Sequence, residues 1–233
     1  MFRPSVVAKF VQFSTPLEGD ELAPYPDNRN LITVGIGCLL DSPGFALALP
    51  LTWQLPDGSK ASNAEVVRQL SALKALDLRN WPATSSRVLG ATTIRLTQDS
   101  VLALCSARLA LIEPLALEAF PAFASWPADA QLFWASICWA EGAGAAGINP
   151  NLARVLNMVP PGFLLAIEHA PDPRHPGMFL GAAADISTKN NPGIAPRNAQ
   201  NALALSNAQL VQERGLDPSV LYWPSTPLLA GTP

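Results

Sequence analysis

Three polar residues near the start of the chain are spaced so that they could carry out acid and base chemistry together. Glu18 follows a helical pattern of apolar residues that Pro16 is expected to stop, and Asp27 and Thr33 come soon after it. A carboxyl group at the buried end of a helix is a suitable general acid, because burial penalises its charged form, whereas a wetter carboxylate stays ionised. Glu18 and Asp27 can fill these two roles, with Thr33 holding a water molecule that Asp27 activates.

The residues around Thr33 predict a strand with one nearly bare face. Residues 31–37 read Leu-Ile-Thr-Val-Gly-Ile-Gly and alternate as a β-strand does. The period of two puts the apolar side chains on one face and Thr33, Gly35 and Gly37 on the other. A bare backbone beside a hydroxyl and a carboxylate lets a flat polymer such as a glycan approach closely, so the pattern indicates glycoside hydrolysis.

This segment resembles the signature of the phage-type lysozymes, glycoside hydrolase family 24, which includes the pesticin-like toxin muramidases. The family pattern of Glu-Gly, then Tyr and Asp, then Thr-x-Gly-x-Gly falls on Glu18-Gly19, Tyr25, Asp27 and residues 33–37 with the same gaps. The resemblance implies that Glu18 is the catalytic acid and Asp27 the base or electrostatic partner. It also implies that Thr33 orients the attacking water.

The resemblance also implies a reaction and a fold. The reaction is hydrolysis of the β-1,4 bond between N-acetylmuramic acid and N-acetylglucosamine in peptidoglycan, without a cofactor. Inversion at the anomeric carbon is expected, with the two carboxyl groups about 6.5–9.5 Å apart. The fold is α+β and mostly helical, with a lysozyme-like small β-sheet lobe and a helical lobe joined by a long helix.

Looser similarities extend over most of the chain. Residues 96–99 resemble the start of the family's long helix, and residues 144–147 resemble a turn in its helical lobe. Arg197 is expected to be the family arginine that pairs with the catalytic Glu, or else a surface charge at a helix start. Trp139 could stack on a sugar ring, although an aromatic residue on an apolar helix is more often part of the core. Cys38 stands where the family usually has His.

The elements that must position these residues are mostly helices. Ser62 to Glu65 read as a capping box that begins an amphipathic helix. Another helix is expected after Thr97, with Pro114 kinking or ending it. Segment 43–60 carries a Pro-Asp-Gly turn signal and reads as an inserted loop or hairpin. Further helices are expected at about 127–140, 150–158, 161–169 and 195–214.

These elements predict one muramidase domain over residues 1–216. Its small lobe is expected at about 14–95, and its helical lobe at about 96–216 together with the N-terminal helix. Residues 217–233 are rich in proline and are expected to form a surface tail.

Composition narrows the possible functions. Hydrophobic residues make up 49% of the chain and charged residues 14%, which indicates a packed soluble protein. No uninterrupted apolar run approaches the roughly 18 residues of a membrane helix, so no membrane span is expected. The net charge is −3 without a basic cluster, so nucleic-acid binding is not expected. No signal peptide is evident, which predicts synthesis in the cytoplasm.

The remaining reactive residues predict no metal site. Cys38, Cys105 and Cys138 all lie in apolar segments and are expected to be reduced core residues. His169 and His175 have no other ligand at a metal-binding spacing. Glu141 is expected to be a charge at a helix end and not a second acid.

Two other interpretations stay open. The chain could be a non-catalytic cell-wall-binding or structural module that has kept the fold and lost hydrolysis. If it is an enzyme, it could be a phage lysis enzyme that reaches the wall through a lysis pore. It could instead be an antibacterial toxin delivered by an injection apparatus, which would have an immunity or inhibitor protein as a partner.

Overall fold

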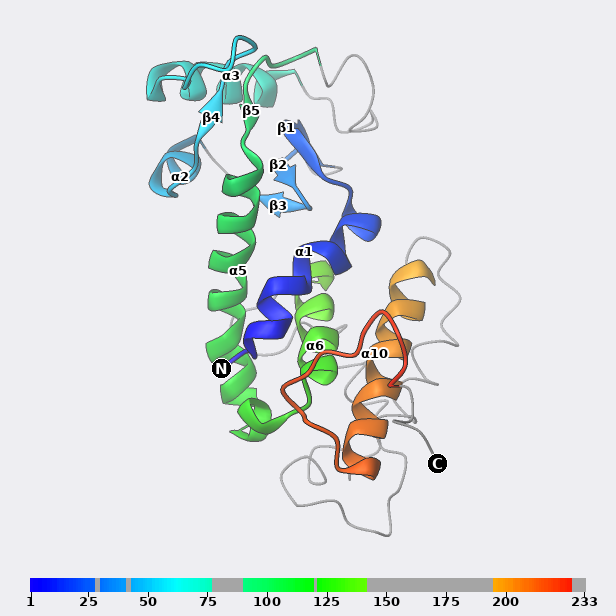
Figure 1. Cartoon of the computed structure of the whole chain (residues 1–233). Helices are drawn as coiled ribbons and strands as arrows, with labels where there is room; N and C mark the ends of the chain where they lie inside the picture. Colours follow the sequence, from blue (N-terminus) through cyan, green and yellow to red (C-terminus); the bar gives the residue numbers. More distant parts are fainter. Residues whose placement is uncertain (28–29, 41–42, 77–89, 120, 142–194, 228–233) are drawn as a thin grey trace. The chain divides into compact units, whose positions relative to one another are not determined.

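The protein is mixed α and β and mostly helical, with small antiparallel sheets (Figure 1). The computed structural model describes residues 1–27, 30–40, 43–76, 90–119, 121–141 and 195–227. The helices are α1 (Pro4–Glu18), α2 (Pro43–Ala48), α3 (Asn63–Ala75), α5 (Gln98–Ala119), the 3-10 turn η1 (Pro121–Ser125), α6 (Ala128–Glu141) and α10 (Ala195–Arg214). The strands are β1 (Glu21–Pro26), β2 (Ile32–Gly35), β3 (Cys38–Leu39), β4 (Trp53–Gln54) and β5 (Arg95–Leu96).

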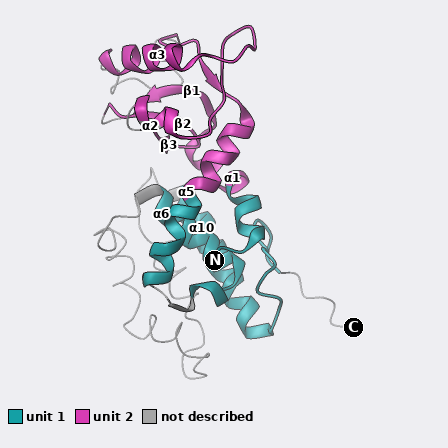
Figure 2. Ribbon diagram, turned by 90° about the vertical axis from the view of Figure 1, so that its left-hand side faces the viewer, with its two compact units in different colours: residues 1–10, 109–233 teal, residues 11–108 magenta. Residues whose placement is uncertain are grey.

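The chain divides into two compact units (Figure 2). Unit 1 contains residues 1–10 and 109–233, and unit 2 contains residues 11–108. The boundaries fall inside α1 and α5, so each of these helices contributes residues to both units. The predicted lobe boundary near residue 14 lies inside α1, as the observed boundary between residues 10 and 11 does. The predicted boundary near residue 96 lies in β5, before the observed boundary between residues 108 and 109.

Unit 2 is built on a three-stranded antiparallel sheet in the order β1-β2-β3. Tyr25 of β1 is opposite Thr33 of β2, and Thr33 is opposite Leu39 of β3. The predicted strand over residues 31–37 is shorter in the structure, because Gly35 and Gly37 have φ values of +62° and +78° that end β2 and form a turn. The predicted strand is therefore one arm of a hairpin whose other arm is β3.

The predicted insertion, residues 43–60, contains more regular structure than a loop. It holds α2 and β4, and β4 pairs with β5 in a second antiparallel sheet. The predicted turn is present, with Gly58 donating to the carbonyl of Leu55 at 2.9 Å. Helix α3 begins as predicted, because the Ser62 hydroxyl accepts a hydrogen bond from the Glu65 amide at 3.2 Å.

Helix α1 ends two residues later than the proline predicts. Val6, Phe10 and Phe13 are buried, as their helical spacing requires. Pro16 lies inside the helix, which continues to Glu18. The amide of Gly19 donates to the carbonyl of Thr15 at 2.9 Å and closes the last turn. Pro16 therefore does not stop the helix, but Glu18 is its last residue, as the position of an acid at a helix exit requires.

Helix α5 buries one face along its whole length. Val101, Cys105, Leu109 and Ile112 are each at most 5% exposed, which confirms the predicted spacing. The helix passes through Pro114 and ends at Ala119, so this proline does not end it.

By length and composition, residues 98–118 of α5 form one helix that could cross a membrane, and 39% of its most apolar stretch is buried in the fold. Core helices of water-soluble proteins meet the same criterion, so the predicted absence of a membrane span remains a prediction.

Unit 1 packs α6 against α10 and adds the N-terminus of the chain. Arg3 donates from its amide to Gln131 Oε1 at 2.7 Å and from Nε to the carbonyl of Trp126 at 2.8 Å. The ring of Phe2 packs edge-on against Phe123, with the centroids 5.1 Å apart. Helices at about 127–140 and 195–214 were predicted, and α6 and α10 confirm them.

The predicted C-terminal tail is hydrogen-bonded to the core of unit 1. The Asp129 carboxylate of α6 accepts hydrogen bonds from the amides of Tyr222 at 3.0 Å and Trp223 at 2.9 Å. Asn207 Nδ2 donates to the carbonyl of Ser225 at 2.8 Å, and Trp223 is buried. Most of residues 217–227 are exposed, as expected for a surface segment, but Trp223 and Pro227 are buried and hydrogen bonds join the segment to α6 and α10.

Several predicted features lie outside the described residues. These are the helices at 150–158 and 161–169, the turn at 144–147, and His169 and His175.

Candidate active site in unit 2

The Glu18 carboxyl group lies directly over the backbone of Gly37. A methyl group added at Gly37 would lie 3.1 Å from Glu18 Oε2 and 3.4 Å from Glu18 Cδ. Glu18 is half-buried at the end of α1, and Gly37 lies in the turn between β2 and β3. The helix end and the hairpin turn thus create the position of this acid, and a residue without a side chain makes room for it.

Asp27 is held in the turn that joins β1 to β2. Its amide donates to the carbonyl of Leu31 at 2.8 Å, and its Oδ1 accepts from the Leu31 amide at 2.8 Å. Asn30 has φ +60°, as its residue type allows, and its Nδ2 donates to the carbonyl of Lys74 at the end of α3. Asp27 is therefore a half-buried carboxylate on a turn that is fixed at both ends.

Thr33 and Tyr25 form a pair across the sheet. Directly opposed residues of antiparallel strands place their side chains on the same face, so the hydroxyl of Thr33 and the phenol of Tyr25 share a face of β1 and β2. Thr33 is buried, and its Oγ1 donates to the carbonyl of Leu31 at 3.4 Å, which is a long hydrogen bond. The weakness of this bond leaves the hydroxyl able to take a better partner.

Burial and the surrounding acidic residues change the pKa of Tyr25. Burial, followed by the negative charges of Glu18, Glu21 and neighbouring groups that include Asp27, raises the pKa of Tyr25 to about 12. The phenol therefore stays neutral and can donate a hydrogen bond at any pH near neutrality. Glu18 and Asp27 both lie close enough to Tyr25 to act on it, so the structure brings these two carboxylates to one region.

Sequence reasoning placed Tyr25 in the motif and gave it no role. A signal was available, because Tyr25 and Asp27 are two residues apart and residues two apart in an extended segment share a face.

Gly35 was predicted to lie on a bare face of the strand, but it lies against Val101 of α5. A methyl group at Gly35 would lie 3.2 Å and 3.3 Å from the two methyl carbons of Val101 on α5. Alternation of the strand ends at this residue because its φ is +62°. Gly35 thus packs against a helix on the side where a side chain would point, whereas Gly37 meets the catalytic candidate itself.

The two remaining predicted site residues belong to unit 1. Trp139 is 5% exposed and packs on Phe10 with ring centroids 4.9 Å apart, which is the environment of a core residue, so its stacking on sugar stays a prediction. Arg197 is 8% exposed near the start of α10, which excludes a solvated surface charge. Its Nη1 donates to the carbonyl and hydroxyl oxygens of Ser136 at 3.3 Å and 3.2 Å.

Within the described residues, His, Cys, Asp and Glu side chains form no group of three or more that could hold a metal ion. The chemistry that the site can perform with its own groups is proton transfer between carboxyl groups, a hydroxyl and water.

The fold and the site thus define a mostly helical α+β protein with two carboxylates and a threonine gathered in one compact unit. Comparison of the chain with protein families, with curated proteins and with solved structures finds no match.

Proposed function

We propose that the protein is a muramidase that hydrolyses the β-1,4 bond between N-acetylmuramic acid and N-acetylglucosamine in peptidoglycan. The observation that carries the proposal is the half-buried Glu18 carboxyl group lying over Gly37 at the end of α1. Asp27 and Thr33, the two other residues that the motif requires, lie in the same compact unit.

In the proposed reaction, Glu18 enters protonated and gives its proton to the glycosidic oxygen as the bond to the anomeric carbon breaks. Asp27 takes a proton from a water molecule that attacks the same carbon from the opposite face of the sugar. The products are a reducing sugar and a new hydroxyl group at the leaving end, so the reaction consumes one water molecule. This course inverts the anomeric configuration.

Thr33 and Tyr25 have supporting parts in this proposal. The Thr33 hydroxyl makes only a 3.4 Å bond to Leu31 in this structure, so it can orient the attacking water without losing a strong interaction. Tyr25 stays protonated because its pKa is raised to about 12, and its neutral phenol adds no further negative charge beside Glu18 and Asp27. The site therefore holds two ionisable groups with separate tasks.

A lysozyme-like arrangement belongs to the same proposal. Unit 2 supplies a small sheet lobe, unit 1 supplies a helical lobe, and α5 contributes residues to both. In this arrangement Arg197 would be the arginine that pairs with the acid, as the family resemblance implies.

The proposal is tested by measuring reducing sugar released from purified peptidoglycan. Glu18→Gln keeps the size of the side chain and removes the transferable proton, so we expect activity to fall by about 10²–10⁴-fold. Glu118→Gln makes the same chemical change at an exposed position near the end of α5, and we expect it to leave activity unchanged. Equal activity in the two variants would exclude Glu18 as the acid.

A non-catalytic wall-binding module is the second candidate, and one observation favours it. Asp27 Oδ1 accepts a hydrogen bond from the Leu31 amide, which is also what an aspartate with a purely structural role in a turn does. Release of no sugar by the wild-type chain from several wall types, together with its co-sedimentation with insoluble peptidoglycan, would support binding without hydrolysis.

The route to the wall is also a proposal. A chain made in the cytoplasm would reach peptidoglycan through a lysis pore or an injection apparatus. A toxin needs a neutralising partner in the cell that makes it, whereas a lysis enzyme does not. Co-purification of a small protein that inhibits sugar release would therefore favour the toxin.

A further inference from the structure

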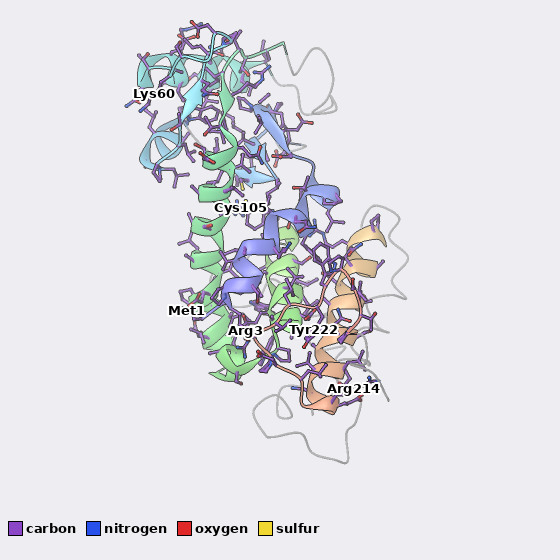
Figure 3. All side chains as sticks on the ribbon, in the orientation of Figure 1. Met1, Arg3, Lys60, Cys105, Arg214 and Tyr222 are labelled. Carbon is purple, nitrogen blue, oxygen red and sulfur yellow. The ribbon has the colours of Figure 1, made fainter. Side chains whose placement is uncertain are left out.

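Two cysteines of unit 2 lie where the β2–β3 hairpin meets α5. Cys38 is the first residue of β3 and is paired with Val34 of β2. Val101 of α5 touches Gly35 at the end of the same hairpin. Cys105 comes four residues after Val101 and is therefore on the same face of α5, about one turn further along. Figure 3 shows Cys105 on α5 beside the strands of this sheet.

The two thiol groups are buried close to each other. Cys38 and Cys105 are 0% and 2% exposed, and a hydrogen bond to Cys38 is the largest cause of the raised pKa of the Cys105 thiol. The third cysteine, Cys138, is buried in unit 1, and its environment is apolar enough for burial alone to raise its pKa to about 12. The sequence does not indicate which two of the three cysteines lie together. The fold places Cys38 and Cys105 together in unit 2 and Cys138 in unit 1.

We propose that Cys38 and Cys105 form an intramolecular disulfide bond when the chain folds in the presence of a small-molecule disulfide such as oxidised glutathione. One thiolate attacks the glutathione disulfide, which releases one reduced glutathione and leaves a mixed disulfide. The second thiolate then attacks the protein sulfur of that mixed disulfide and releases the second glutathione. The two cysteines lose two electrons and two protons, and one oxidised glutathione becomes two reduced molecules.

The environment of the pair determines when the bond forms. The hydrogen bond with Cys38, followed by burial, raises the pKa of the Cys105 thiol, and the nearby Arg108 opposes this effect only in part. A protonated buried thiol reacts slowly, because the thiolate is the nucleophile. Oxidation is therefore slow in the folded reduced protein and fast while the chain folds, when both thiols meet solvent before they are packed together.

The bond would fasten the hairpin that carries Gly37 to α5. Gly37 supports the Glu18 carboxyl group, so the cross-link restrains the backbone beneath the proposed acid. Closing a chain segment of this length stabilises a protein mainly by restricting its unfolded state. The inference does not depend on hydrolysis, since the bond can be detected in an inactive protein.

The test is refolding of the full chain from urea in a buffer of oxidised and reduced glutathione, followed by mass spectrometry of peptides prepared without reductant. We expect a mass lower by two hydrogen atoms, a peptide that links Cys38 to Cys105, and one remaining thiol at Cys138. The midpoint of thermal unfolding should rise by about 5–10 °C relative to the same protein in dithiothreitol.

Single variants distinguish this pair from chance pairing. Cys138→Ala should still form the link and keep the rise in midpoint, whereas Cys105→Ala should lose both. Three free thiols in the refolded wild-type chain, or links that include Cys138 as often as Cys38, would overturn the proposal. The count of free thiols and links in the wild-type chain needs no variant. It therefore remains a valid test even if Cys105→Ala fails to fold.

Discussion

The position of the Glu18 carboxyl group depends on the absence of a side chain at Gly37. Oε2 lies 3.1 Å from where a Cβ atom would be, which is closer than carbon and oxygen atoms comfortably approach. Gly37 also has φ +78°, a backbone conformation that strains any other residue. One residue therefore meets two demands, one from the backbone and one from the proposed acid.

The effect of Gly37 on the backbone and its effect on the proposed acid can be separated by substituting Gly37 and, for comparison, another glycine. Gly58 has φ +81° and nothing within 4 Å of an added methyl group. We expect Gly37→Ala and Gly58→Ala to lose a similar stability of about 1–3 kcal/mol in urea unfolding, because both carry the same backbone strain. Only Gly37→Ala should also lower sugar release, by at least about tenfold, since a shifted acid transfers its proton poorly. A similar loss of activity in both variants would show that strain alone is responsible.

The pKa of Tyr25 offers a test of the site that needs no activity. Folding raises this pKa from 10.0 to about 12, so the folded chain holds the phenol proton more tightly than the unfolded chain does. The resulting stabilisation is complete below pH 10 and is lost as the pH rises through about 12. An alkaline titration of tyrosinate absorbance should show one late-titrating phenol that disappears in Tyr25→Phe.

The same titration reports whether Glu18 is close to Tyr25. Removing the negative charge in Glu18→Gln should lower the pKa of Tyr25, because that charge is the second-largest cause of its rise. Glu118→Gln should leave this pKa as it is. An unchanged Tyr25 titration in Glu18→Gln would contradict the arrangement of the site.

At the level of elements, contact between α5 and the β2–β3 hairpin determines how the site is supported. The hairpin turns at two glycines with left-handed backbones, and one of them fits against Val101. Such a contact between a backbone and a branched side chain leaves little free space, so the two elements constrain each other.

A double-mutant cycle measures this constraint. Gly35→Ala places a methyl group 3.2 Å from Val101, and we expect it to destabilise the protein by about 1–3 kcal/mol through crowding and backbone strain. In the Val101→Ala background the crowding is absent and only the strain remains. The double variant should therefore be more stable than the sum of the single effects by about 0.5–3 kcal/mol in urea unfolding. Strict additivity would mean that the contact carries no energy.

At the level of the whole chain, residues far apart in the sequence complete unit 1. The buried Asp129 carboxylate of α6 accepts hydrogen bonds from Asn207 of α10 and from the amides of Tyr222 and Trp223. These three donors offset much of the desolvation of the carboxylate, yet burial still raises the pKa of Asp129. The C-terminal segment is thus bound to the core through a carboxylate whose burial favours its protonated, neutral form.

We expect substitution of Asp129 to lower the stability of the protein and to change how that stability depends on pH. Asp129→Asn puts an amide among three donors, so we expect a loss of about 1–3 kcal/mol in urea unfolding. Because the folded pKa of Asp129 is raised, the stability it contributes is fully present below its ordinary value of 3.8 and falls as the pH rises through the folded pKa. The advantage of the wild-type chain over Asp129→Asn should accordingly shrink from acidic to neutral pH.

Asp217 provides a control, because its contribution to stability should change with pH in the opposite direction. Hydrogen bonds from Ser219 lower the pKa of Asp217, so its contribution is present above its ordinary value and is lost as the pH falls through the lowered one. The advantage of wild type over Asp217→Asn should therefore grow from acidic to neutral pH. The same pH trend for both variants would contradict the assigned environments.

Several features of this protein were determined by local sequence alone. The spacing of apolar residues predicts α1, α3, α5, α6 and α10 because one face of each helix must be buried, and Ser62 marks a helix start because its hydroxyl caps an amide. Asn30 adopts the left-handed backbone that its residue type tolerates. The expectation that Pro16 stops its helix was wrong, and Pro114 does not end α5, because a helix can lose one hydrogen bond when its packing is strong.

Only the tertiary structure decided which residues meet. The sequence shows Glu18, Asp27 and Thr33 at suggestive spacings. Three contacts join segments that are distant in the chain: Glu18 with Gly37, Trp139 with Phe10, and Asp129 with the amides of Tyr222 and Trp223. The proximity of Cys38 and Cys105 is of the same kind. A periodic pattern specifies which face of an element is buried and not which element covers it, since many partners bury the same apolar area equally well and packing of the whole unit selects among them.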